Sequence, residues 1–201
     1  IRVFMSKRKE VAPERRKGRE LLRKYGLLKK LSDNKECSIN KNMCGKCIDC
    51  NLYGSAVGND ISIQSHIVTE ESFSLLNHSK VSTKHTFNAL YENGTMKDPE
   101  TGESARSIQR DEVIRSGTTF LSTELVTDVT KNEFKYVLSN ILRTKRYGAQ
   151  STRLGKIKND VVAVVFSNCE LFSNIEWLQA TYDLICSELN VSNDDLPEFP
   201  I

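Results

Sequence analysis

The sequence predicts an α+β fold in which helices cover a β-sheet, and three segments carry this prediction. Residues 131–146 place apolar side chains at positions i, i+3, i+4, i+7 and i+8, which is the spacing of an amphipathic helix. Residues 160–166, DVVAVVF, form a nearly continuous β-branched run, typical of a strand buried on both faces. Residues 174–190 return to helical spacing. With a further strand expected at residues 118–126, strands and helices alternate as they do in α+β domains.

The composition is that of a globular chain with strongly polarised charge. The 201 residues are 38% hydrophobic, which is enough for a core and excludes a generally disordered chain. No stretch approaches about 18 consecutive apolar residues, so no transmembrane helix is expected. The chain starts at Ile1 rather than at Met, from which we expect a fragment of a longer protein. Separate basic segments at residues 1–30 and 143–158 favour a polyanionic partner.

The first 34 residues are expected to form a basic helical segment. Residues 1–30 carry 12 basic and 3 acidic side chains, and residues 14–31 combine basic residues with an apolar stripe at helical spacing. Basic side chains around such a stripe either form a solvated helix face or contact nucleic acid. The candidates for nucleic-acid contact on this helix are Arg15, Arg16, Arg19 and Arg23.

Four cysteines lie within 14 residues, and they are Cys37, Cys44, Cys47 and Cys50. Thiolates are soft ligands, and four of them satisfy tetrahedral zinc, so we predict a structural zinc site in an insertion at residues 35–52. His66 is a substitute ligand should one cysteine point away. Two alternatives remain open, namely part of an iron–sulfur signature and a set of free or redox-active thiols. The two remaining cysteines, Cys169 and Cys186, lie far away in apolar segments, and the pattern favours a reducing, cytoplasmic location.

The middle of the chain predicts a polar hairpin. Residues 77–117 contain the turn signals Asn93-Gly94 and Pro99 to Gly102, which favour tight turns and positive φ. We therefore expect residues 53–76 to be part of the core, residues 77–117 to form a hairpin and residues 118–201 to complete the core. Within the last segment, Thr130 and Glu133 have the spacing of a helix capping box.

A basic loop follows the helix predicted at residues 131–146. Glycines let a backbone approach a phosphate closely, and hydroxyl and amide side chains donate hydrogen bonds to it. Tyr147 offers a ring for stacking on a base. The same composition also suits an ordinary surface loop. The candidate RNA-binding residues are Lys145, Arg146, Tyr147, Gln150, Ser151, Thr152, Arg153 and Lys156.

Several of these segments, in this order, resemble a known family. Residues 89–103, ALYENGTMKDPETGE, and residues 109–120, QRDEVIRSGTTF, look like the thumb hairpin of RAMP-superfamily backbone subunits of CRISPR effector complexes. Residues 52–55, LYGS, resemble that family's Leu-Phe-Gly-Ser turn. The four-cysteine insertion before this turn resembles the CRISPR-RNA-binding backbone subunit of type I-D (Cascade) complexes.

The resemblance implies a ferredoxin-like, RRM-like core (the palm) with an extended β-hairpin thumb and a small four-cysteine zinc insertion. It implies a subunit that polymerises along CRISPR RNA and presents the guide to target DNA in antiviral defence. The implied partners are CRISPR RNA, target DNA, further copies of the chain and other effector subunits, without a membrane. The family's N-terminal strand is expected to be missing here. The thumb residues implied to contact the guide and target are Lys84, His85, Met96, Lys97, Arg106 and Arg110.

Two other functions remain open at this point. One is a metal-dependent backbone subunit of the same superfamily that cleaves target RNA, and the other is a zinc-ribbon protein that binds nucleic acid. The sequence contains no Walker-type glycine loop, no G-x-S-x-G and no metalloprotease motif, so we predict that the chain is not an enzyme.

Overall fold

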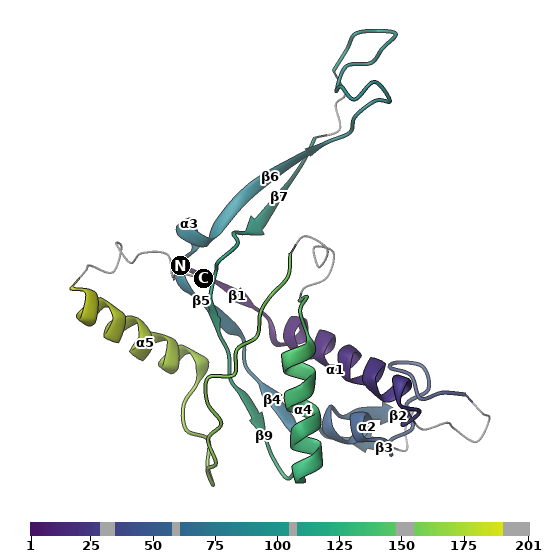
Figure 1. The fold of residues 1–201 in the computed structure, drawn as a ribbon, viewed down its shortest axis with the longest axis vertical. Coiled ribbons are helices and arrows are strands. Elements are labelled where there is room, and N and C mark those ends of the chain that lie inside the picture. The colour runs from purple at the N-terminus through teal and green to yellow at the C-terminus, as the bar shows by residue number, and fades with distance from the viewer. Residues whose placement is uncertain (29–34, 58–60, 105–107, 148–154, 191–201) are drawn as a thin grey trace. The chain divides into compact units, whose positions relative to one another are not determined.

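The computed structural model describes residues 1–28, 35–57, 61–104, 108–147 and 155–190. Internal contacts divide the chain into two compact units. The smaller unit consists of Ile1–Val3, Ser74–Phe120 and Thr181–Ile201, and the larger one consists of Phe4–Phe73 and Leu121–Ala180. Figure 1 shows the order of the elements along the chain.

Helices and sheets are mixed along the chain, which confirms the predicted fold class at this level. The helices are α1 (Lys7–Lys24), α2 (Ile48–Leu52), α3 (His78–Val81), α4 (Lys131–Arg143) and α5 (Asn174–Leu189). The strands are β1 (Arg2–Met5), β2 (Ser55–Val57), β3 (Ile61–Ile63), β4 (Ile67–Thr69), β5 (Ser72–Asn77), β6 (Ser82–Asn88), β7 (Ile108–Ile114), β8 (Phe120–Leu121) and β9 (Glu124–Val126). The described strands form one three-stranded sheet in the order β1-β5-β8 and three two-stranded sheets, β2-β3, β4-β9 and β6-β7. No described helix has both the length and the apolar character that crossing a bilayer requires.

The core of the larger unit lies between α1, α4 and the segment that leads into α2. Its fully buried members include Leu52 and Val137, and Leu22 of α1 packs in the same cluster. Helices α1 and α4 lie side by side (Figure 1). They meet at Gly18, where an added Cβ would lie 2.4 Å from both the Asn140 side-chain nitrogen and the Tyr136 hydroxyl. The absence of a side chain at Gly18 therefore allows this close helix–helix contact.

Helix α1 begins and ends earlier than the predicted basic helix at residues 14–31. It starts at Lys7, after strand β1, so the expectation of an N-terminus without a strand is wrong. It ends at Lys24 because Gly26 adopts a φ of 65°, and its amide donates to the Arg23 carbonyl at 3.0 Å. The amide of Leu27 donates to the Leu22 carbonyl at 2.8 Å, which completes a Schellman motif.

The strand predicted at residues 118–126 is divided into β8 and β9. The hydroxyl of Ser122 donates to Glu10 Oε2 at 2.9 Å, and that of Thr123 donates to Asn174 Oδ1 at 2.7 Å. Ser122 and Thr123 lie between β8 and β9, where the strand pairing stops, and their side chains form hydrogen bonds with residues of other segments. The capping box at the start of α4 is confirmed, with Thr130 and Glu133 each accepting from the other's backbone amide.

The strand predicted at residues 160–166 is wrong for this structure. These residues have no strand assignment, and Val162 and Phe166 are among their exposed apolar side chains. A β-branched run favours extended backbone, but burial on both faces also requires flanking strands, which the described residues do not supply here. Helix α5 is confirmed, although two of its apolar side chains, Ile175 and Leu189, are exposed.

Candidate metal centre and nucleic-acid interface

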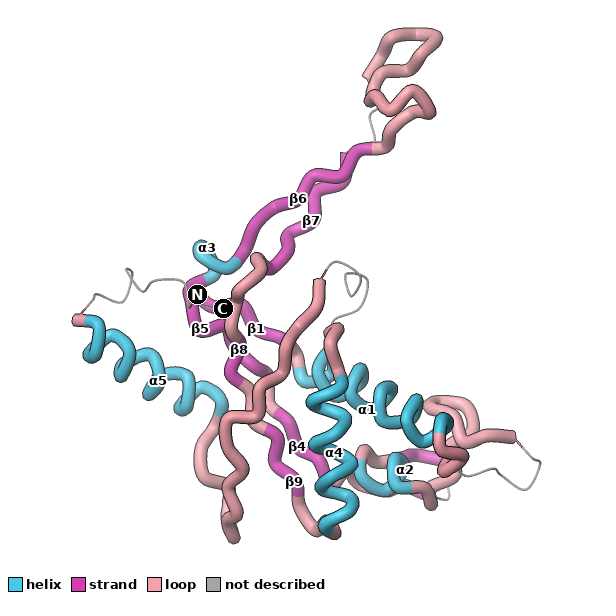
Figure 2. The backbone as a smooth tube through the Cα atoms, in the orientation of Figure 1, coloured by secondary structure: helices cyan, strands magenta, loops and turns pink. Residues whose placement is uncertain are grey.

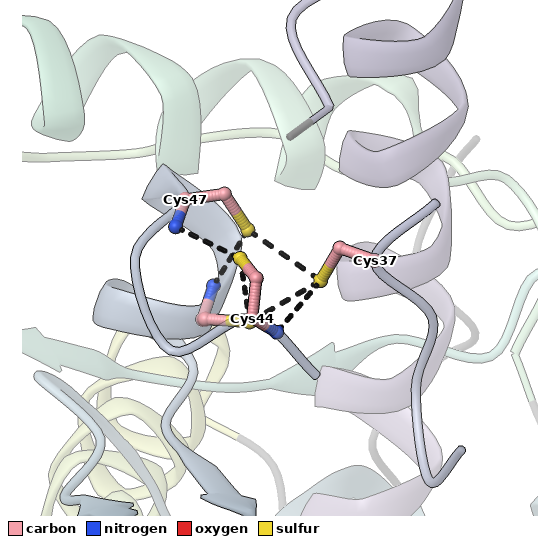
Figure 3. Close-up of side chains that lie close together, drawn as sticks. Cys37, Cys44 and Cys47 are labelled. Atoms are coloured by element: carbon pink, nitrogen blue, oxygen red, sulfur yellow. Dashed lines mark hydrogen bonds between the residues drawn. The ribbon is translucent and has the colours of Figure 1, made fainter. Parts of the chain in front are cut away.

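The four cysteines of the insertion come together around one point. We call residues 35–52 the cysteine loop; Cys37 lies after α1, Cys44 and Cys47 precede α2, and Cys50 lies within α2. The Cys37 sulfur lies 3.5 Å from that of Cys50 and 3.9 Å from that of Cys47, and all four sulfurs lie within 4.8 Å of one another. Figure 3 shows the sulfurs of Cys37, Cys44 and Cys47 converging from opposite sides of the loop. His66 is therefore not needed as a substitute ligand.

The sulfur separations match the edges of a metal tetrahedron. Four sulfurs at about 2.3 Å from a central zinc lie about 3.8 Å from one another. The separation between the Cys44 and Cys50 sulfurs is 4.0 Å, close to this edge length. Three of the four residues are buried and none forms a disulfide. The cluster can therefore hold one metal ion with all four positions filled by protein, which is the arrangement of a structural site.

Backbone amides in the cysteine loop point at the sulfurs. The amide of Cys44 donates to Cys37 Sγ at 3.4 Å, that of Cys47 to Cys44 Sγ at 3.3 Å, and that of Cys50 to Cys47 Sγ at 3.5 Å. Burial raises the pKa of the Cys44 thiol, but the amides of Lys46 and Cys47 outweigh it and lower that pKa to about 7. Burial raises the pKa of the Cys47 and Cys50 thiols. Amide donors favour the thiolate form, which is the form that binds metal.

Only part of the predicted basic face of α1 is exposed to solvent. Arg19 is buried and binds Asp49 with Nη1 at 2.6 Å, and Arg15 binds the same carboxylate at 3.0 Å. These two residues are spaced i, i+4 and therefore share the face of α1 that packs on the cysteine loop. Arg19 is therefore buried and Arg15 is partly buried in this ion pair, and their contact with nucleic acid stays a prediction. Arg16 is exposed, and Arg23 forms an exposed ion pair with Glu36.

The smaller unit contains a long two-stranded hairpin. Strands β6 and β7 pair in an antiparallel register over seven residues, from Ser82 opposite Ile114 to Asn88 opposite Ile108 (Figure 2). The described part of the connection carries two tight turns, in which Gly94 and Gly102 adopt φ values of 72° and 70°. Positive φ at these glycines agrees with the turn signals in the sequence.

The register assigns the hairpin residues to two faces. Lys84 lies opposite Glu112, and Arg110 lies opposite Thr86, so both cations share one face. His85 lies on the other face, where its ring stacks on that of Phe87 at a centroid distance of 6.3 Å.

Phe87 is 41% exposed and is not among the predicted thumb residues. The sequence contains a signal for Phe87, because residues two apart in a strand share a face and His85 is a predicted thumb residue. Of the other predicted thumb residues, Lys97 is exposed, Met96 is partly buried, and Arg106 lies outside the described residues.

The basic loop after α4 is described at its two ends. The amide of Ile157 donates to the Lys145 carbonyl at 2.9 Å, so the ends lie side by side, and Lys145, Arg146 and Lys156 are exposed there. The predicted RNA contacts Gln150, Ser151, Thr152 and Arg153 lie outside the described residues.

Tyr147 is anchored inward by its hydroxyl. That hydroxyl donates to Glu14 Oε1 at 2.9 Å and accepts from Asn159 Nδ2 at 2.6 Å. Only the partly exposed ring is left to contact a base, and that role stays a prediction. The anchor fixes the first part of the basic loop to helix α1.

Two buried carboxyl groups lie beneath this anchor. Glu14 is 3% exposed, and among the described residues no N–H or hydroxyl donor reaches Glu14 Oε2 or Glu124 Oε2. In this buried place the charge of Glu124 opposes ionisation of Glu14, which favours a proton on the pair. Burial, followed by the charge of Glu124, raises the pKa of Glu14 from 4.5 to about 10. At neutral pH the pair therefore shares a proton.

Glu14→Gln should stabilise the protein increasingly as the pH rises. A carboxyl whose pKa is raised by folding stabilises the native state below its unfolded pKa of 4.5, and this contribution is lost as the pH rises towards about 10. The amide of the substituted side chain supplies the missing donor without ionising. We expect a gain in unfolding free energy of about 1–3 kcal/mol at pH 8. The gain should be near zero at pH 4.5.

Urea unfolding of both proteins between pH 4.5 and 9 measures this difference. Glu20→Gln is the control, because Glu20 is an exposed residue of the same helix that pairs with Lys17. A Glu14→Gln variant whose advantage did not change with pH would contradict the shared proton.

A family model described as Csc2 Crispr matches residues 1–198. The chain is also similar to the crystal structure of Thermofilum pendens Csc2, with a TM-score of 0.50 and 21% sequence identity. The similarity covers 74% of this chain and 51% of that one, so the chain spans about half the length of the solved structure. No curated protein sequence matches.

Proposed function

Because the chain belongs to the Csc2 family of CRISPR proteins, we propose that it is a non-catalytic Cascade backbone subunit that polymerises along CRISPR RNA. In this role the chain presents the guide for pairing with target DNA in antiviral defence, together with further copies of itself and other effector subunits. The observation that carries the proposal is the family match over residues 1–198. Six free cysteines are compatible with the reducing cytoplasm in which such a complex works.

In this role, three parts of the chain have separate functions. The cysteine loop at residues 35–52 holds structural zinc, supported by four converging sulfurs at tetrahedral separations. Residues 77–117 act as the thumb, supported by the seven-residue ladder between β6 and β7. Residues 53–76 and 118–201 supply an RRM-like palm.

The basic loop after α4 is the proposed grip on the RNA backbone. Lys145, Arg146 and Lys156 are exposed where its ends meet, and cations at such a place neutralise phosphates without reading sequence. Sequence-independent contact is what a subunit that accepts any guide requires. Gln150 to Arg153 complete this proposed surface.

Native mass spectrometry of the full complex tests the proposal. A backbone subunit should appear in several copies on one guide RNA, together with the other subunits. Mg²⁺-dependent cleavage of target RNA, abolished by a single Asp substitution, would instead establish the cleaving subunit. A chain that bound nucleic acid as a single copy, without a guide, would be a zinc-ribbon binding protein.

Phe87→Ala should weaken binding of the complex to its target about 5- to 160-fold. The exposed rings of His85 and Phe87 lie on the hairpin face away from Lys84 and Arg110, and an aromatic ring stacks on an unpaired base with about 1–3 kcal/mol. Ile114→Ala is a matched control, since Ile114 is 42% exposed and lies on the opposite face. Fluorescence of 2-aminopurine placed along the guide reports the stacking. Equal losses of target affinity in the two variants would show that the aromatic face has no special role in target binding.

A further inference from the structure

An ion-pair network centred on a fully buried carboxylate joins helix α1 to the cysteine loop. Asp49 lies in α2 between Cys47 and Cys50, and its side chain is 0% exposed. Its carboxylate accepts from Arg19 Nη1 at 2.6 Å and from Arg15 Nη2 at 3.0 Å. Both guanidinium groups come from α1, so a single carboxylate holds two consecutive turns of this helix.

Arg19 extends from this network to one of the four cysteines. Its Nη2 donates to the Cys37 carbonyl, and its Nη1 lies 3.8 Å from Cys37 Sγ. The Arg19 side chain is only 2% exposed, so its charge is not screened by solvent. One guanidinium therefore contacts the carboxylate of Asp49 and both the backbone and the sulfur of Cys37.

The charges of the network complement those of a metal site. Zinc with four thiolates carries a net charge of about −2. Two arginines and one aspartate contribute a net charge of +1 beside it, and Arg19 is the member that touches a cysteine. Outer groups of this kind orient a ligand and raise its affinity for the metal.

We propose that Arg19, oriented by Asp49, is the outer-sphere positioning residue of the metal centre and couples metal binding to the docking of helix α1. This inference rests on the metal centre proposed above. Arg19 holds Cys37 in the ligand orientation and offsets thiolate charge. Conversely, the ordered cysteine loop holds α1 in place through Asp49.

Arg19→Gln is the test variant, because it removes the charge while Arg15 keeps Asp49 paired. We expect a 10- to 100-fold faster transfer of zinc to a chelator from this variant. In the Co²⁺-loaded protein the thiolate charge-transfer bands should shift, which a loss of stability alone would not cause. Arg23→Gln is the control, since Arg23 lies one turn further along α1 in an exposed ion pair with Glu36.

Hydrogen exchange of the wild-type chain with and without zinc tests the coupling to α1. Removal of the metal should increase exchange in residues 12–22, even if Arg19→Gln fails to fold. Unchanged release rates and Co²⁺ spectra in Arg19→Gln, or unchanged exchange in α1, would overturn the inference while leaving the metal centre intact. Purified wild-type chain that bound neither Zn²⁺ nor Co²⁺ would overturn the metal centre and the inference together.

Discussion

Cys47→Ser is expected to abolish stoichiometric zinc binding and to loosen the cysteine loop. Serine offers a hard oxygen that stays protonated at neutral pH, so the fourth soft ligand is lost. The serine hydroxyl can still cap α2, because it can accept from the amide of Cys50 as Cys47 Sγ does, so the loosening is expected from loss of the metal. Structural zinc contributes about 10–16 kcal/mol to comparable small sites, so we expect zinc affinity to fall by more than 100-fold.

Metal analysis combined with hydrogen exchange measures both effects. Exchange should rise in residues 35–52 and remain unchanged in the hairpin of the smaller unit, which makes its own ladder. Cys169→Ser is the control, because Cys169 is exposed and lies outside the cluster. Iron with broad visible absorption in the wild-type chain would establish an iron–sulfur centre. Full zinc occupancy in Cys47→Ser would exclude Cys47 as a ligand.

Shortening the hairpin should disrupt ordered assembly and target pairing by at least tenfold. Asn88 and Ile108 are cross-strand partners, so an Asn-Gly turn can replace residues 89–107 and close the ladder. The residues removed reach beyond the ladder, and their apolar side chains include Leu90 and Met96. Apolar side chains inserted between base steps unstack them.

The charge of the tip predicts which measurement will change. Residues 91–104 contain four acidic side chains and one lysine, so the tip does not attract phosphate by net charge. The affinity of the chain for guide RNA should therefore stay within about twofold of wild type, with an unchanged salt slope. Glu100→Gln, an exposed tip substitution, is the control. A complex with the shortened hairpin that assembled and paired with its target normally would exclude the thumb role of residues 77–117.

Local patterns in the sequence were sufficient for several elements. The start of α4 follows from Thr130 and Glu133, because a capping box involves only four consecutive residues. The turns at Gly94 and Gly102 follow from the conformational freedom of glycine. The grouping of the four cysteines follows from their spacing, since short loops leave their sulfurs few ways to lie far apart.

Other features depend on which surfaces meet, and a local pattern does not contain that information. A continuous β-branched run at residues 160–166 favours extended backbone but does not specify a neighbouring strand, and here these side chains are exposed. Helix α1 ends before residue 31 because Gly26 adopts a positive φ, which terminates the helix. The apolar stripe continues past Gly26 and therefore does not mark the end of the helix.

Helix α1 is the clearest example of the difference between what the local sequence specifies and what tertiary contacts decide. The sequence alone was enough to predict a helix with many arginines followed by a four-cysteine metal site. It could not distinguish Arg16, which is exposed, from Arg19, which is buried. That distinction arises because Asp49, some 30 residues further along the chain, lies under one face of α1, where it pairs with the buried Arg19 and the partly buried Arg15. A buried charge is stable only with such a partner, and only the folded chain brings the partner to it.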